Sequence, residues 1–177
     1  EKGLASGRVL QIGLRGRQRG PVDTRAEVAA DDVLFQGLGF TLAGPLRVGG
    51  RLQATGEGRY YWHGTLAVQV ATQCRRCLIP VNAPVSADIG VLFSQDDLVA
   101  DDPDAYAVPA NAVDVDLRPA VREELALAVP AWVVCREDCR GPCPRCGKDL
   151  NAGPCGCDPT PDVRWQSLAD LKTKLRQ

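Results

Sequence analysis

Eight cysteines constrain the fold of this 177-residue chain more than any other feature of its sequence. Two of them form a central Cys-x-x-Cys motif, and the other six lie between residues 135 and 157. Eight thiolates make two complete tetrahedral sets, and zinc is the ion that structural sites of this kind usually hold. The candidate zinc ligands are Cys74, Cys77, Cys135, Cys139, Cys143, Cys146, Cys155 and Cys157.

The spacing of the cysteines indicates how they pair. Both sulfurs of a Cys-x-x-Cys turn reach one ion, so the central motif supplies half of one site and Cys143–Cys146 half of another. The short segment that follows lets Cys155 and Cys157 return to the second turn and close a zinc-ribbon-like site. The remaining pair, Cys135 and Cys139, then joins the central motif in a long-range site. Exchange of the two distal pairs is the rival arrangement, and the spacing does not exclude it.

Two other uses of cysteine remain open from the sequence. Four disulfides suit a secreted chain of fewer than about 100 residues better than this longer one. A redox Cys-x-x-Cys motif usually opens a helix after a strand, whereas this motif ends a strand-like run and precedes Pro80. All-thiolate zinc sites leave no position open for water, so we expect them to be structural. The working class is a cytoplasmic zinc protein, with disulfide bonding and thiol redox chemistry as alternatives.

Composition is ordinary for a soluble globular protein, with 45% hydrophobic and 24% charged residues. No run of about 18 apolar residues is present, and no signal-peptide pattern opens the chain. We therefore expect no membrane contact.

Hydrophobic patterning predicts a β-rich N-terminal part. Residues 8–14 read as a first strand, and residues 38–70 repeat near period two around a hairpin turn at residues 56–58. Residues 80–93 supply another strand. A helix is predicted over residues 117–129, capped by Asp116, with Pro119 in its first turn and an apolar stripe along one side.

These elements predict an α+β fold in two parts. Residues 1–133 form an antiparallel β-sheet or partly open barrel with one packed helix. Residues 134–177 form a cysteine-rich, zinc-ribbon-like segment that ends in a terminal helix. Within the first part we expect residues 94–116 to form an acidic loop, because they hold seven aspartates and no Lys or Arg.

Outside that acidic segment the chain has 21 basic and 15 acidic residues, although its formal net charge is −1. The basic candidates for RNA contact are Arg15, Arg17, Arg19, Arg75, Arg76, Arg140, Arg145, Lys148, Lys172, Lys174 and Arg176. Each group has a simpler interpretation. The first three fit a solvated loop, those among the cysteines compensate thiolate charge, and the last three complement a helix dipole.

Catalytic residues are not predicted. The lone histidine, His63, has no partner to complete a site, and Glu123 and Glu124 read as ordinary residues of an exposed helix face. We therefore expect a non-enzymatic protein.

Several motifs of this chain resemble those of the YceD family, whose members are required for accumulation of large-subunit ribosomal RNA in bacteria and plastids. The resemblance covers residues 70–177 and depends mainly on the long cysteine string. Its motifs are Cys74-Arg75-Arg76-Cys77-Leu78, Asp116-Leu117-Arg118, Glu123-Glu124-Leu125, Val129-Pro130, Cys135, Cys139-Arg140-Gly141-Pro142-Cys143-Pro144-Arg145-Cys146-Gly147, Leu150-Asn151, Cys155-Gly156-Cys157 and Asp162-Val163-Arg164-Trp165.

The resemblance implies a ribosome biogenesis factor that acts on large-subunit ribosomal RNA, on a pre-ribosomal particle or on a protein bound to it. Family genes typically neighbour the gene of a small zinc-ribbon protein of the large subunit, which makes that protein an expected partner. A zinc-stabilised adaptor that binds protein rather than RNA remains the alternative, because no aromatic platform for stacking RNA bases is visible in the sequence.

Overall fold

The N-terminal part of the chain is a mixed β-sheet with one α-helix against its buried face. The computed structural model describes residues 10–14, 20–95 and 105–157, together with Arg164, Leu168 and Leu171. Contacts divide the chain into two units, Glu1–Cys135 and Arg136–Gln177, and each is described by itself.

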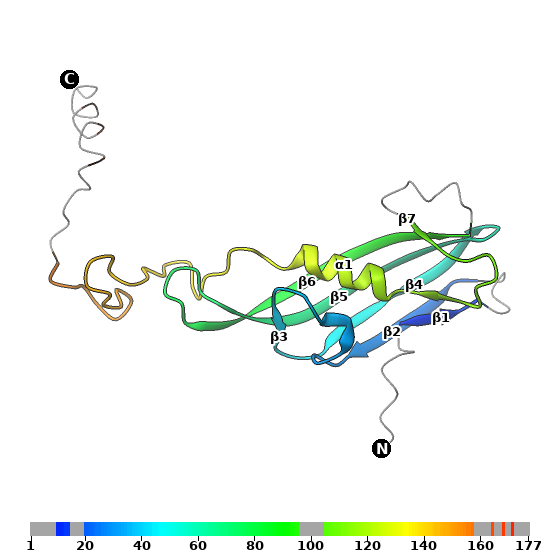
Figure 1. Ribbon diagram of the computed structural model, residues 1–177, viewed down its shortest axis with the longest axis horizontal. Helices are drawn as coiled ribbons and strands as arrows, with labels where there is room; N and C mark the ends of the chain where they lie inside the picture. Colours follow the sequence, from blue (N-terminus) through cyan, green and yellow to red (C-terminus); the bar gives the residue numbers. More distant parts are fainter. Residues whose placement is uncertain are drawn as a thin grey trace, which may run out of the picture. The chain divides into compact units, whose positions relative to one another are not determined.

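Within its described residues, the first unit contains eight strands, a short 3-10 helix and one α-helix. They are β1 (Gln11–Gly13), β2 (Val22–Val28), η2 (Val33–Phe35), β3 (Thr41–Leu42), β4 (Leu46–Gly56), β5 (Arg59–Gln73), β6 (Pro80–Ser94), β7 (Ala105–Ala107), β8 (Asp114–Asp116) and α1 (Arg118–Ala128). Six of these strands form a sheet in the order β2-β4-β5-β6-β7, with β3 beside one end of β5. Neighbours are antiparallel except β6 and β7, which run parallel. Figure 1 shows α1 along one face of this sheet.

The central hairpin of the sheet confirms the pattern predicted from the sequence. β4 and β5 are joined by a turn at Glu57 and Gly58, and Gly58 adopts a φ of 64°. Glycine enters this left-handed region without a steric penalty, which is why the turn forms here. β6 then pairs with β5 over its whole length and includes the predicted strand at residues 80–93.

Trp62 of β5 fills the middle of the buried face. Its side chain is fully buried, and its indole Nε1 donates a hydrogen bond to Oγ1 of Thr24 on β2 at 2.9 Å. A Cβ atom built on Gly64 would lie 2.5 Å from Cζ2 of this indole, and one on Gly50 would lie 2.6 Å from it. The two glycines, which are paired across β4 and β5, therefore make the space that the indole occupies.

Helix α1 buries the stripe that its sequence predicts. Val121 and Leu125 are fully buried in the core, and Leu117, just before the helix, is 1% exposed. The predicted role of Asp116 needs correction, because the residue at the cap position is Leu117. The Asp116 carboxylate instead accepts a hydrogen bond from the backbone N–H of Arg118 at 2.9 Å and forms an ion pair with its guanidinium. This pair lowers the pKa of Asp116, against the opposing effect of burial.

Two parts of the first unit differ from expectation. β2 was not predicted, because its seven residues present a charged face (Asp23, Arg25, Glu27) as prominent as its apolar one. Two of these charges pair across the strands, Arg51 with Asp23 at 2.7 Å and Arg47 with Glu27 at 3.6 Å.

The acidic segment expected as a loop over residues 94–116 contains two short strands, β7 and β8. β7 is held by Tyr106, whose ring centroid lies 5.6 Å from that of Phe93 and whose hydroxyl donates to Glu123 at 2.6 Å. Three-residue strands are too short to show a period in the sequence, which is the reason the prediction was wrong there. Residues 96–104 lie outside the described part of the chain.

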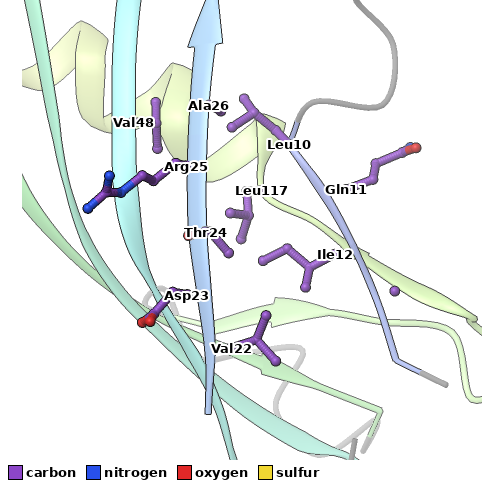
Figure 2. Close-up of a pocket in the computed structure, with 11 residues that line it drawn as sticks. Leu10, Gln11, Ile12, Val22, Asp23, Thr24, Arg25, Ala26, Val48 and Leu117 are labelled. Atoms are coloured by element: carbon purple, nitrogen blue, oxygen red, sulfur yellow. The ribbon is translucent and has the colours of Figure 1, made fainter. Parts of the chain in front are cut away.

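β1 and β8 form a separate two-stranded ribbon next to β2, so the sheet does not close into a barrel. Figure 2 shows Leu10, Ile12, Val22 and Leu117 pointing toward one another between β1 and β2, while Asp23 points away. The cavity there has a volume of about 220 Å³. Asp23 and Arg25 also line it, but in Figure 2 both point away from the apolar side chains, and Asp23 pairs with Arg51. We therefore interpret the cavity as a gap in packing and not as a candidate active site.

The second unit contains little regular structure within its described residues. An isolated bridge between Pro142 and Asp149 closes a short ribbon around the second Cys-x-x-Cys turn. Leu168 and Leu171 are helical, and the residues around them in the predicted terminal helix lie outside the described part of the chain.

Candidate metal centres

The eight cysteines gather into two groups of four. The first comprises Cys74, Cys77, Cys135 and Cys139, and the second Cys143, Cys146, Cys155 and Cys157. Within each group all sulfur atoms lie within 4.8 Å of one another, and no disulfide joins any of the eight cysteines. These are the two sets that the spacing favoured over the rival exchange of distal pairs. Each group can hold one metal ion with four sulfur ligands.

Both groups are built on the same backbone turn. In the central motif the N–H of Leu78 donates to the carbonyl of Cys74 at 2.9 Å, and the N–H of Cys74 donates to the carbonyl of Ile79 at 2.9 Å. In the second motif the N–H of Gly147 donates to the carbonyl of Cys143 at 2.9 Å, and the N–H of Cys143 donates to that of Lys148 at 2.8 Å. Residues 74–79 and 143–148 therefore form two equivalent turns of the knuckle type, which we call the first and second knuckles.

The fifth residue of each knuckle has a positive φ. Gly147 adopts 72°, and Leu78, at the same place in the first knuckle, adopts 64°. Leu78 is the only non-glycine residue with a positive φ in the described part of the chain. A side chain in this conformation crowds the following carbonyl, so a glycine is the ordinary solution.

The knuckle geometry stabilises a thiolate on the first cysteine of each turn. The backbone N–H of Cys77, 3.5 Å from the sulfur of Cys74, is the main cause that lowers the pKa of Cys74 to about 6. The N–H of Arg76, at 3.4 Å, acts in the same direction. The pKa of Cys143 is likewise lowered to about 6, chiefly by the backbone N–H of Cys146. Both leading sulfurs are therefore prepared as anionic ligands.

The last cysteine of the second group shows the opposite shift. The neighbouring sulfurs, that of Cys146 first, raise the pKa of Cys157 to about 12. Four sulfurs this close cannot all lose their protons without a compensating positive charge, because the thiolates repel one another. A divalent cation at the centre of the group supplies that charge, so the donor set fits a metal such as zinc.

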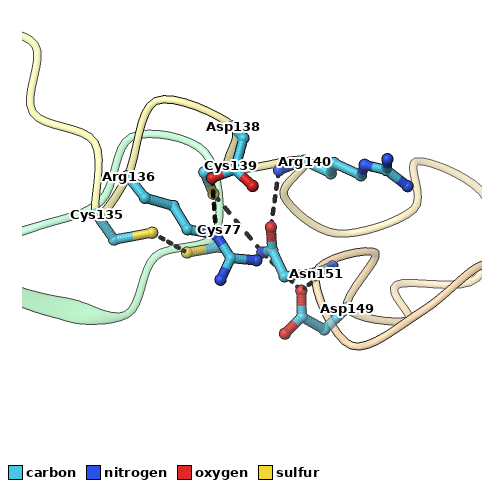
Figure 3. A network of polar contacts seen from close by, with 8 residues as sticks. All are labelled: Cys77, Cys135, Arg136, Asp138, Cys139, Arg140, Asp149 and Asn151. Carbon is cyan, nitrogen blue, oxygen red and sulfur yellow. Dashed lines mark hydrogen bonds and ion pairs between the residues drawn. The ribbon is translucent and has the colours of Figure 1, made fainter.

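Asn151 supports the sulfur groups from the second unit. Its Nδ2 lies 3.6 Å from the sulfur of Cys139, and its Oδ1 accepts from the backbone N–H of Arg140 at 2.8 Å. Asp149 in turn accepts from Nδ2 of Asn151 at 2.8 Å, as Figure 3 shows. The sequence analysis named Leu150-Asn151 as a motif of the family resemblance but predicted no role for the Asn151 side chain.

The basic residues proposed for RNA contact fall into three sets. Arg15, Arg17, Arg19, Lys172, Lys174 and Arg176 lie outside the described residues. Lys148 donates from Nζ to the carbonyl of Pro154 at 3.0 Å, which holds the segment leading to Cys155. Arg75, Arg76, Arg140 and Arg145 are exposed, so these four keep the possibility of contact with a phosphate.

One more basic residue among the cysteines, Arg136, has an acidic neighbour. Arg136 forms an ion pair with Asp138 at 3.2 Å (Figure 3). The guanidinium is half exposed, so this pair contributes little stability by itself. Figure 3 also shows the sulfurs of Cys77 and Cys135, which lie 3.7 Å apart.

In the first sulfur group, burial of the leading cysteine is unlike a redox site. A redox Cys-x-x-Cys motif exposes its attacking thiolate, whereas Cys74 is completely buried. Among the described residues, no helix has the length and apolar character needed to cross a bilayer.

Comparison with known proteins places these features in a wider group. Residues 62–172, which include all eight cysteines, match the family described as large ribosomal RNA subunit accumulation protein YceD. An uncharacterized protein of Mycobacterium tuberculosis is 28% identical over 187 aligned positions, covering 91% of this chain and 90% of the relative. An uncharacterized protein of Mycobacterium leprae is 27% identical, covering 61% of this chain and 51% of the relative.

A named relative comes from a plant. The large ribosomal RNA subunit accumulation protein YCED homolog 1, chloroplastic, of Arabidopsis thaliana is 24% identical over 110 residues. The alignment covers 55% of this chain and 34% of the plant protein. No solved structure matches this chain.

Proposed function

Because this chain belongs to the YceD family, we propose that it is a non-enzymatic factor of ribosome biogenesis that supports accumulation of large-subunit ribosomal RNA. The observation that carries the proposal is the match over residues 62–172, which contains both sulfur groups and helix α1. The plant relative with the same printed function supports it from a distant lineage. The cytoplasm, where bacterial ribosomes assemble, is the proposed location.

Zinc is the metal that we propose for both sulfur groups. Four thiolate ligands with no water position suit structural zinc, and the ordered knuckles fit that role. The zinc ions would bind the eight cysteines and hold their segments folded, while the surfaces of the protein make contact with its partners. Elemental analysis of the purified chain should give two zinc ions per molecule, and Cys143→Ser with Cys146→Ser should leave one.

The proposed partners are large-subunit ribosomal RNA in a pre-ribosomal particle and the small zinc-ribbon ribosomal protein of that subunit. The test is the level of large-subunit ribosomal RNA, relative to small-subunit RNA, in cells that lack the gene. We expect this ratio to fall and to recover when the gene is restored. An unchanged ratio would rule the proposed function out.

An adaptor that binds only protein is the second candidate function. The balanced net charge of −1 and the ion pairs that neutralise the exposed face of β2 favour it over a large nucleic-acid interface. Crosslinking in cells separates the two. Recovery of a ribosomal protein after nuclease treatment, without crosslinked RNA, would support the adaptor.

A further inference from the structure

An exposed apolar and basic surface lies where β5 and β6 are joined. It consists of Arg75, Arg76, Leu78 and Ile79 in the first knuckle and Trp132 in the segment after α1, and we call it the knuckle-tip surface. Its three apolar side chains are exposed: Leu78 to 63%, Ile79 to 50% and Trp132 to 69%. Large apolar side chains gathered at this exposure indicate a contact site.

The segment that carries Trp132 is fixed against the knuckle. The backbone N–H of Arg75 donates to the carbonyl of Val133 at 2.8 Å, and Nε of Arg75 donates to the carbonyl of Ala131 at 3.3 Å. These two bonds hold the residues on both sides of Trp132. The indole is thus presented on an ordered base, so little conformational entropy remains to be lost when a ligand binds.

Leu78 has a strained backbone that core packing does not explain. Its φ of 64° is the conformation that Gly147 adopts in the equivalent turn, and glycine would satisfy the backbone without a penalty. The leucine side chain is mostly exposed, so it does not repay the strain by packing in the core. Strain of this kind at an exposed position points to a functional contact.

The charge of the surface defines its partner. Residues 74–80 and 130–135 contain two arginines and no acidic residue. The Nη1 and Nη2 groups of Arg75 make no hydrogen bond to the described residues, and both arginines are exposed. The thiolate of Cys74 is buried beneath them and is already stabilised by backbone N–H groups.

The partner must therefore present negative charge beside flat apolar faces. Each nucleotide of unpaired RNA meets both requirements, because it carries a charged phosphate and an accessible flat base. Proteins commonly bind single-stranded RNA with a combination of aromatic side chains and arginines. We propose that the knuckle-tip surface binds unpaired RNA, with a base stacked on Trp132 and phosphates at Arg75 and Arg76. This inference rests on the proposed function for the presence of ribosomal RNA near the protein.

The experiment measures binding of the full-length, zinc-loaded chain to a fluorescent single-stranded RNA of 12 nucleotides and to a duplex of the same sequence. Trp132→Ala should weaken single-strand binding on the order of tenfold, and Trp132→Phe should retain most of the affinity. Arg76→Gln should reduce the slope of log affinity against log salt by about 0.7. Leu127→Ala and Arg47→Gln are the matched controls, since both alter exposed residues elsewhere in the first unit, and both should bind as the wild type does.

Zinc content and the unfolding midpoint of each variant establish that the fold is unchanged. The proposal is overturned if Trp132→Ala and Arg76→Gln bind single-stranded RNA like the wild type, or if the wild type shows no preference for single strands. It is also overturned if Trp132→Ala loses a ribosomal protein from nuclease-treated extracts while its RNA affinity is unchanged. These results are independent of the ribosomal RNA ratio in cells, which tests the proposed function alone.

Discussion

Leu78 and Gly147 occupy the same position in two equivalent knuckles. Comparing the two positions therefore allows the cost of the left-handed backbone conformation to be measured within one protein. A left-handed conformation costs a residue with a Cβ about 1–2 kcal/mol, while glycine loses about 0.5–1 kcal/mol of extra chain entropy on folding. The cost of the left-handed conformation for leucine therefore exceeds the extra entropy cost of glycine. The difference isolates the backbone, because a Cβ on Gly147 would meet no atom within 4 Å.

We expect Leu78→Gly to raise the free energy of unfolding by about 0.5–1 kcal/mol, and Gly147→Leu to lower it by a similar amount. Urea unfolding of the zinc-loaded protein measures both. A loss of stability in Leu78→Gly would mean that the leucine side chain contributes contacts that outweigh its strain.

At the scale of the element, the hairpin of β4 and β5 depends on two kinds of glycine. Gly64 faces Trp62, and a Cβ there would also lie 2.5 Å from the carbonyl oxygen of Gly49. Gly49 points the other way, and the nearest atom to its Cβ would be the carbonyl oxygen of Thr24 at 4.0 Å. The hairpin thus has one position on β5 that is closed to a side chain and one on β4 that is open.

Gly64→Ala should destabilise the protein by about 1–3 kcal/mol, because backbone and indole must both shift to admit the methyl group. Gly49→Ala is the control and should leave stability unchanged or raise it by up to about 1 kcal/mol. Thermal unfolding followed by tryptophan fluorescence distinguishes them. Equal effects from the two substitutions would contradict the packing of Trp62 described above.

The knuckles themselves respond to pH. The thiols of Cys74 and Cys143 have a pKa of about 6 in the folded chain, against about 8.5 for an unfolded thiol. A lowered pKa contributes stability that is fully present above the unfolded value and is lost as the pH falls through the folded value. Bound zinc requires the same thiolates, so its affinity changes in the same direction.

Zinc bound per chain should therefore be constant at pH 8 and above and decline as the pH is lowered toward and below 6. Release can be followed with a chromogenic chelator in buffers of constant ionic strength. Retention of both ions at pH 4 would show that the thiolates are not the ligands.

At the scale of the whole molecule, the two units depend on metal to different degrees. The first unit has a core of buried apolar side chains from the sheet and α1. The second has no comparable core among its described residues. Its ordered elements, the short ribbon and the Cys-x-x-Cys turn, both lie around the sulfur atoms of the second group. Structural zinc contributes on the order of 10 kcal/mol to the folding of small domains. We therefore expect removal of zinc to destabilise the second unit more than the first.

Chelation should leave the sheet folded and unfold residues 136–157. Limited proteolysis is expected to cut the chelated protein in that segment and to spare a fragment near residues 20–135, while the zinc-loaded protein resists. Far-ultraviolet circular dichroism should keep its β signal after chelation. Loss of the whole β signal would mean that the first unit also depends on zinc.

Local features of the fold could be predicted from the sequence alone. Cysteine spacing favoured the two sets of four, since a Cys-x-x-Cys turn fixes the direction of its own sulfurs, but it left the exchange of the two distal pairs open until the sulfurs were located. Alternating residues predicted the hairpin of β4 and β5 with its turn at Gly58, and the stripe at Val121 and Leu125 predicted the buried side of α1. In each case the signal lies within a few residues of the structure that it specifies.

Features that depend on distant neighbours appeared only in the folded chain. β7 is a strand because it pairs with β6, where Tyr106 packs on Phe93, and β2 is one because all seven of its residues pair with β4. Trp132 stands beside the first knuckle because Arg75 bonds the residues around it, although 57 positions separate the two in the chain. A sequence pattern records what each residue prefers, whereas such contacts arise only when the chain folds and brings the partners together.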